Sequence, residues 1–170
     1  MNKQTEKSVW LAVYTKSRHE KTANNEFMKK GIESYLPLIK TRVQWKDRKK
    51  WVWKPLFRSY IFVKILLNNT LYVLQTHGVH HIVKFNGKPA VIPDNQIEAV
   101  KLILEGGYHP DLHEYLEVGD EVEIIDGPLR GLRGILSRKD RRTRFVLKLD
   151  GIQQALSLEI SQEFLKKVKK

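Results

Sequence analysis

The sequence contains no cysteine. This absence excludes a disulfide framework and a thiolate metal site. The sequence also lacks an apolar run of about 18 residues, the length that a membrane-spanning helix needs. Its first ten residues, MNKQTEKSVW, hold no apolar segment long enough for a secretory signal. From these absences we expect a cytoplasmic protein of bacterial type that does not associate with membranes.

Catalytic and metal-binding patterns are lacking as well. The sequence shows no Ser/His/Asp order, paired-carboxylate signature, P-loop or dinucleotide fingerprint. His109 and His113 are four residues apart, a spacing that can bind zinc on a helix, but Pro110 lies inside the pair and no cysteine assists. A second group of histidines, His77, His80 and His81, clusters in the sequence but forms no better metal-ligand pattern. We therefore expect neither an enzyme nor a metal or cofactor site.

Acidic residues are scarce relative to basic ones. The chain has 31 Lys and Arg against 19 Asp and Glu, a formal net charge of +12. Residues 1–65 hold 16 basic and 5 acidic residues, residues 66–116 hold 3 and 5, and residues 117–170 hold 12 and 9. A positive field concentrated in one part of a chain attracts polyanions. We expect nucleic acid, or a machine that holds it, as the partner, and a merely solvated basic surface is the alternative.

The order of strand-like and helix-like segments predicts an α+β architecture. The chain has 170 residues, enough for one ordinary domain or two small ones, and 41% of them are apolar, which is enough for a packed core. Mixed strands and helices in this order indicate an antiparallel sheet with helices packed against it, an α/β sandwich. We expect strands at 9–15, 32–45 and 59–67, a basic hairpin with its tip at 47–50, a second hairpin at 80–93 around Asn86-Gly87, and helices within 18–31, 68–78 and 94–107.

The second half of the sequence reads differently. Residues 106–116 break the periodicity with two glycines and a proline, which predicts a linker between a first domain at 8–105 and a second at 117–170. The second domain holds short strands and turn signals, as in a small β-barrel of about five strands. Its stretch GDEVEIIDGPLRGLRG contains four of the ten glycines of the chain. We expect Gly127, Gly131 and Gly134 at tight bends or close backbone approaches.

Three blocks of sequence resemble one family. GDEVEIIDGPLRGLRGIL resembles the KOW motif, which occurs in ribosomal proteins and in transcription elongation factors. The blocks WLAVYTKSRHEKTANNEF, PLFRSYIFVKI and GVHHIVKFNGKPAVIP resemble the N-terminal domain of the NusG family of transcription factors. The last two look most similar to the specialised RfaH-like paralogues. The resemblance spans residues 9–168 and implies a NusG-type N-terminal domain, a flexible linker and an SH3-like KOW barrel.

The resemblance implies a binding site for RNA polymerase. In the family, an apolar depression of the N-terminal domain receives the tip of the clamp helices of the largest polymerase subunit. Tyr60 and Phe62 lie two apart and share one face of a strand, and aromatic side chains supply large contact areas. The alternative is that these aromatics are core residues. The positions that the resemblance assigns to the depression are Tyr60, Phe62, Val83, Phe85 and Ile97.

The basic hairpin is a candidate contact for nucleic acid. Residues 44–54, QWKDRKKWVWK, alternate cations with three tryptophans, a pattern typical of surfaces that stack on bases and pair with phosphates. Family members place this hairpin near the non-template DNA strand. The alternative is a solvated hairpin whose tryptophans fix it to the domain. The candidate residues are Trp45, Arg48, Lys49 and Lys50.

The first helix is the second candidate contact for DNA. RfaH-like relatives use this region to read exposed bases of the non-template strand, and Lys16 and Lys29 fall on basic positions of that pattern. Glu26 stands where the resemblance implies a base-contacting polar residue. Thr70 is the one residue that fits a polar contact with the other large polymerase subunit. Ordinary exposed helix charge is the alternative for the basic set Lys16, Arg18, Lys21 and Lys29.

These features together predict an elongation and antitermination factor that acts at specific operons as a monomer. The N-terminal domain would bridge the polymerase cleft, and the KOW domain would recruit a small-subunit ribosomal protein or the Rho terminator. The alternatives are a housekeeping NusG factor and, in another class, a ribosomal or RNA-binding KOW protein. The glycines and Pro128 of the C-terminal domain disfavour a helical form, so we expect a β-barrel there with the polymerase site open.

Overall fold

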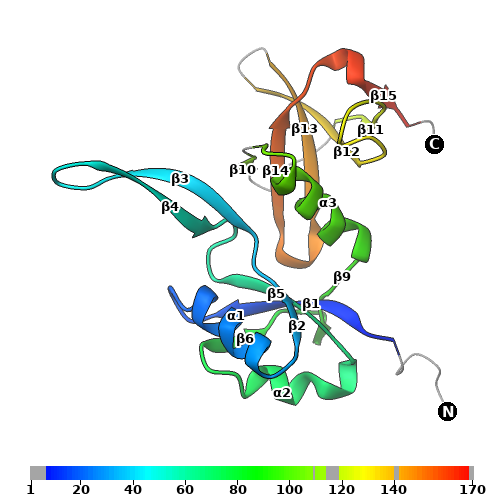
Figure 1. Ribbon diagram of the computed structural model, residues 1–170. Helices are drawn as coiled ribbons and strands as arrows, with labels where there is room; N and C mark the ends of the chain where they lie inside the picture. The colour runs from blue at the N-terminus through cyan, green and yellow to red at the C-terminus, as the bar shows by residue number, and fades with distance from the viewer. Residues whose placement is uncertain (1–6, 109, 114–118, 140–141, 169–170) are drawn as a thin grey trace. The chain divides into compact units, whose positions relative to one another are not determined.

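The chain forms two compact units, Met1–Asp94 and Asn95–Lys170 (Figure 1). The computed structural model describes residues 7–108, 110–113, 119–139 and 142–168. By its contacts the helix that follows Asp94 groups with the second unit, whereas the sequence assigns it to the N-terminal domain. None of the helices in the described part of the chain has the length and apolarity that a membrane crossing requires.

The first unit is built on a five-stranded antiparallel sheet. Its two central strands, β1 and β5, come from the most apolar runs of the N-terminal half, because a central strand is buried on both faces. The strand order is β2-β5-β1-β6, and β9 also pairs with β1. The strands are β1 (Val9–Thr15), β2 (Glu33–Tyr35), β5 (Tyr60–Ile65), β6 (Val79–Ile82) and β9 (Val91–Ile92).

Two helices pack against one face of this sheet. They are α1 (Glu20–Lys29) and α2 (Thr70–Leu74), which follows a 3₁₀ turn at Leu67–Asn69. Alternate residues of the strands point to this face, as period-2 patterning requires. This arrangement confirms the predicted antiparallel sheet covered by helices. The buried cluster consists of Leu11, Val13, Ala23, Phe27, Ile61, Val63, Ile65, Val73, Val79 and Ile82.

The opposite face of the sheet carries the aromatic residues. The register between β1 and β5 sets three pairs side by side: Trp10 with Lys64, Ala12 with Phe62, and Tyr14 with Tyr60. The ammonium group of Lys64 lies 5.7 Å from the ring centroid of Trp10. This face therefore runs from a buried end at Trp10 to a more open end at Tyr14 and Tyr60.

The conformations of individual turn residues determine where several of these helices and strands end. Gly31, predicted to end α1, has φ +68°, which is costly for a residue with a side chain. Asn86 and Gly87 have φ +49° and +77° and join β7 (Lys84–Phe85) to β8 (Lys88–Pro89), as the Asn-Gly pair predicts. Asn69 precedes α2 as predicted, but its side chain makes no capping hydrogen bond.

The basic hairpin consists of β3 (Leu38–Gln44) and β4 (Lys49–Pro55) and projects from the first unit (Figure 1). The predicted strand at 32–45 is in fact split into β2 and β3 at Pro37, because proline has no N–H for a sheet ladder. The predicted tip at 47–50 was two residues too late. The tip is closed by the Trp45 N–H, which donates to the Arg48 carbonyl at 2.7 Å.

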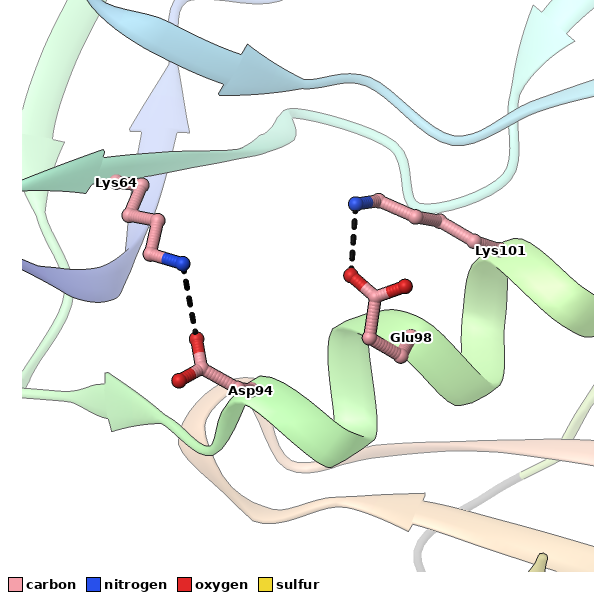
Figure 2. Close-up of polar contacts among 4 residues, drawn as sticks. All are labelled: Lys64, Asp94, Glu98 and Lys101. Carbon is pink, nitrogen blue, oxygen red and sulfur yellow. Dashed lines mark hydrogen bonds and ion pairs between the residues drawn. The ribbon is translucent and has the colours of Figure 1, made fainter.

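The third helix, α3 (Asp94–Glu105), begins at Asp94, and the negative charge of this carboxylate is stabilised by the positive end of the helix dipole. The Asp94 carboxylate forms an ion pair with the ammonium group of Lys64 on β5 at 3.4 Å. One turn later, the Glu98 carboxylate forms an ion pair with the ammonium group of Lys101 at 2.8 Å (Figure 2). Both pairs are solvent-exposed, so each contributes at most about 1 kcal/mol.

The second unit holds a six-stranded antiparallel sheet in the order β10-β14-β13-β12-β11-β15. Its strands β11 to β15 confirm the predicted all-β C-terminal domain. The segment that the sequence predicts as a linker contributes the additional edge strand β10, which pairs with β14. The strands are β10 (Asp111–His113), β11 (Glu121–Ile124), β12 (Arg133–Lys139), β13 (Arg142–Leu149), β14 (Gln154–Glu159) and β15 (Leu165–Lys167).

The glycines at 127, 131 and 134 meet two different structural requirements. Gly127 and Gly131 have φ +78° and +88°, which turns the chain between the two strands. Gly134 lies within β12, where a Cβ atom would stand 2.5 Å from the Val146 carbonyl oxygen and 2.6 Å from the ring of Phe145. Close approach of β13 therefore requires glycine at this position.

Candidate polymerase and nucleic-acid interfaces

A cluster of rings lies at the open end of the aromatic face. Tyr14 of β1 contacts Tyr60 of β5 edge to face, with ring centroids 5.2 Å apart, and stacks on His81 of β6 at 5.1 Å. His80 completes the cluster, since its Nδ1 lies 2.7 Å from Nδ1 of His81. One of these two rings must donate the proton and the other accept it. The accepting ring is therefore neutral.

The surroundings of Tyr60 and His81 favour the uncharged forms of these two side chains. Burial, and secondly the neighbouring Tyr14, raise the pKa of Tyr60 above its ordinary value. Burial, and secondly the charge of His80, lower the pKa of His81. Both shifts favour the neutral forms, and covering a neutral ring with a partner costs less hydration than covering a charged one.

The five residues predicted to contact polymerase differ in exposure. Phe62 is fully buried, in ring contact with Phe57 at 5.9 Å and Tyr35 at 6.5 Å, and Ile97 of α3 is also buried. Tyr60 and Val83 are half-buried. Phe85 exposes 62% of its surface on β7. Phe85 therefore offers an apolar group that a partner could cover without rearrangement of the fold.

The basic residues of the first helix region are all exposed, but two have partners. Lys16 and Arg18 precede α1, and Lys21 and Lys29 lie on it. Lys29 pairs with Glu26 at 2.7 Å, and this hydrogen bond, with the charge of Lys29, lowers the pKa of Glu26. The ammonium group of Lys21 donates to the Trp53 carbonyl at 2.8 Å, which ties α1 to the hairpin.

The tryptophans of the hairpin keep their rings accessible. Trp45, Trp51 and Trp53 expose 50%, 55% and 55% of their surfaces. Lys50 lies 5.5 Å from the ring centroid of Trp45, and Lys40 lies 5.6 Å from that of Trp51. Such exposure leaves aromatic surface available for stacking, and the cations already lie at the distance of cation–π contacts.

Comparison with known proteins identifies the family. Residues 8–101, more than half of the chain, match the family model described as "NusG: Transcription termination factor nusG". The chain belongs to the NusG family. Factors of this family are not enzymes, which confirms the non-enzymatic role expected from the sequence.

Two solved structures align with this NusG-family chain over most of its length. The structure of Thermotoga maritima NusG matches with a TM-score of 0.56 and 20% sequence identity, over 97% of this chain and 99% of that chain. The structure of the MjSpt4:Spt5 complex in conformation A matches with a TM-score of 0.31 and 21% identity, over 95% of this chain and 99% of that chain. The first match supports the fold of the NusG-family chain over nearly its whole length.

Sequence reasoning missed several residues near the candidate surfaces. A groove of about 610 Å³ separates α1 from the base of the hairpin. It could not be found from sequence, because its residues lie on four separate elements or their connections. The ring contacts of Tyr60 with Tyr14 and of Tyr14 with His81 follow only from strand pairing. The groove is lined by Lys21, Asn24, Asn25, Ser34, Leu36, Leu38 and Trp53.

Proposed function

We propose that this NusG-family protein is a specialised, RfaH-like antitermination factor that binds RNA polymerase through its N-terminal unit. The observation that carries the proposal is the exposed Phe85 on β7, in the block GVHHIVKFNGKPAVIP that resembles the specialised paralogues. The ring cluster around Tyr60 supports the same surface. The fully buried Phe62 would shape this surface from beneath and would become a contact only if its covering groups moved.

The mechanism that we propose is a bridge. The apolar surface binds the clamp helices of the largest subunit, and the basic hairpin and first helix contact the non-template DNA. Binding across the cleft favours the closed clamp over the open, paused state, because the factor has higher affinity for the closed state. Pausing and termination are thereby reduced.

The second unit would recruit a further partner. Ile125 and Phe164 expose 41% and 39% of their surfaces and are joined by a 2.9 Å hydrogen bond from the Ile125 N–H to the Phe164 carbonyl. Arg130 and Lys166 line a pocket with Ile125. This apolar and basic surface supports binding of a small-subunit ribosomal protein or Rho, and tethering to the first unit would raise the effective concentration of that partner.

Genome occupancy tests the specialised role. We expect a tagged protein to be enriched over a few operons, because DNA contacts at a pause site add affinity to a polymerase contact that all genes share. Chromatin immunoprecipitation of the tagged protein, compared with immunoprecipitation of polymerase from the same cells, measures this. Occupancy proportional to polymerase on all genes would establish the housekeeping alternative instead.

The basic hairpin is expected to give nucleic-acid binding a steep salt dependence. Each phosphate neutralised on a single strand contributes about 0.7 to the slope of log affinity against log salt. Replacing Arg48, Lys49 and Lys50 together with serine should therefore reduce that slope by up to about 2. Fluorescence anisotropy with a labelled oligonucleotide at several salt concentrations measures it.

A matched control removes the same charge elsewhere. Arg130, Lys166 and Lys167 are exposed on the second unit, so their replacement with serine changes net charge equally. We expect this control to leave most of the slope in place. Equal slopes for the hairpin variant and the unchanged protein would remove the hairpin from the interface.

A further inference from the structure

The β3–β4 hairpin has two unlike faces. In an antiparallel pair, directly opposite residues share a face. One face carries the pairs Ile39 with Lys54, Thr41 with Val52, and Val43 with Lys50, and its β-branched residues are half-buried. On the other face, beyond the half-buried pair Leu38 with Pro55 at its base, every residue is exposed. We name these exposed residues the Trp–cation face: Lys40, Arg42, Gln44, Lys49, Trp51 and Trp53.

The Trp–cation face interleaves rings with positive charge. Trp51 lies opposite Arg42, and Trp53 lies opposite Lys40, whose ammonium group is 5.6 Å from the Trp51 ring centroid. The one acidic residue of the hairpin, Asp47, is at the tip and belongs to neither strand. The exposed aromatic rings can stack on bases, and the cations between them can pair with the phosphates that join those bases.

The spacing of Trp51 and Trp53 favours a nucleic-acid strand whose neighbouring bases are not stacked on each other. Trp51 and Trp53 are two residues apart on β4, so their backbone positions are about 6.7 Å apart along the strand. In a duplex, successive nucleotides of one strand rise only about 3.4 Å. Two neighbouring bases can therefore reach both rings only when they are separated from each other. Duplex bases, stacked on each other, cannot do so without unstacking.

The groove at the base of the hairpin extends this face. Trp53 lines it together with Leu36 and Leu38, which supply an apolar floor. Its volume of about 610 Å³ is ample for a nucleobase. Asn25 of α1 is exposed at the groove, and its amide carries both a donor and an acceptor for a base edge. Asn24 is held in place, since it accepts a hydrogen bond from the Ser34 hydroxyl at 2.9 Å.

We propose that the Trp–cation face binds single-stranded nucleic acid by stacking two successive, separated bases on Trp51 and Trp53. Lys40, Arg42 and Lys49 contact the phosphates, and the base on Trp53 enters the groove beside Asn25. The inference rests on the proposed nucleic-acid contact of the hairpin and specifies its ligand as an unstacked strand. Because every base has an aromatic face, this stacking tolerates any sequence.

The experiment compares single and double strands on the full-length protein. The probes are fluorescein-labelled oligo(dT) and oligo(rU) of twelve nucleotides and a DNA duplex of the same length. Stacking contributes about 1–3 kcal/mol per base, or about 5- to 150-fold in affinity. We expect Trp51→Ala/Trp53→Ala to bind the single strands at least about 10-fold more weakly, with its salt slope unchanged because no charge is removed. Trp51→Phe/Trp53→Phe should retain most of the affinity.

The duplex and the intrinsic fluorescence give independent outcomes. We expect the duplex to bind more weakly than either single strand, and the tryptophan emission of the unaltered protein to be quenched when oligo(dT) is bound. The ratio of oligo(dT) to oligo(rU) affinity then tells which strand, DNA or RNA, the face prefers. Equal affinity for duplex, absence of quenching at saturation, or wild-type affinity of the alanine variant would each overturn the proposal.

The charge variant separates this inference from the function on which it rests. If Arg48→Ser/Lys49→Ser/Lys50→Ser reduces the salt slope while Trp51→Ala/Trp53→Ala binds normally, the hairpin contacts phosphates only. The stacking inference then fails and the proposed DNA contact stands. If neither variant changes binding, both fail. Both tryptophans are exposed, so the alanine variant should melt like the unaltered protein, which circular dichroism checks.

Discussion

Replacing Phe85 with alanine is expected to weaken binding to RNA polymerase by about 30- to 800-fold, the effect of losing a central anchor residue worth about 2–4 kcal/mol. The side chain exposes 62% of its surface in the free protein, so its burial against the clamp helices would be gained only on binding. Its position just before the Asn86-Gly87 turn holds it on a short, defined hairpin. An anchor of this kind loses little conformational freedom when it binds.

The same change should leave the fold intact. Exposed positions usually tolerate substitution within about 0.5 kcal/mol of unfolding free energy. Titration calorimetry with purified core polymerase measures the affinity, and a thermal melt checks the fold. Phe164→Ala, which removes a partly exposed phenylalanine from the second unit, is the matched control and should bind polymerase normally. Unaltered affinity of Phe85→Ala would place the polymerase surface elsewhere.

The elements that sequence predicted well are those fixed by local chemistry. The alternation around Ile61 and Val63 predicts a strand with one face toward the core, and the Asn86-Gly87 pair predicts its turn because both positions need positive φ. Pro37 was the missed local signal: the lack of an N–H splits one expected strand in two. β10 was missed because its pairing with β14 is a long-range contact.

Exposure was the harder property to predict. Period-2 alternation correctly sets Tyr60 and Phe62 on one face, but it does not say that Phe57 and Tyr35 cover Phe62 while Tyr60 stays half-open. The Tyr35 contact joins two separate strands, and the Phe57 contact depends on how the chain turns between β4 and β5. Family resemblance predicts the positions of an interface, and packing decides which side chains a partner can reach without rearrangement.

The proposed nucleic-acid surface shows the same division between what sequence predicts and what packing decides. The alternation of cations and tryptophans in residues 44–54 is visible in the sequence. The register is not, and it is the register that adds Lys40 and Arg42 to the face of Trp51 and Trp53. The groove beside α1 depends on tertiary packing alone, since Asn25 and Leu36 meet only through the fold.

Replacing Gly134 with alanine is expected to lower the unfolding free energy of the second unit by about 3 kcal/mol, the upper end of the usual cost of overpacking. The added Cβ would meet the Val146 carbonyl at 2.5 Å and the Phe145 ring at 2.6 Å. Neither neighbour can move cheaply. The carbonyl belongs to β13, which pairs with β12 on one side and β14 on the other, and Phe145 is fully buried.

Gly127→Asn is the control that separates crowding from backbone strain. Gly127 has φ +78° but open space around its Cα, and asparagine tolerates this conformation better than other residues. For a unit of this size, 1 kcal/mol shifts the melting temperature by about 4–8 °C, so Gly134→Ala should lower it by more than about 10 °C and Gly127→Asn by only a few degrees. Calorimetry of the full-length variants measures both. Equal melting temperatures would show that β12 and β13 lie farther apart in solution, and that crowding by β13 does not require a glycine at position 134.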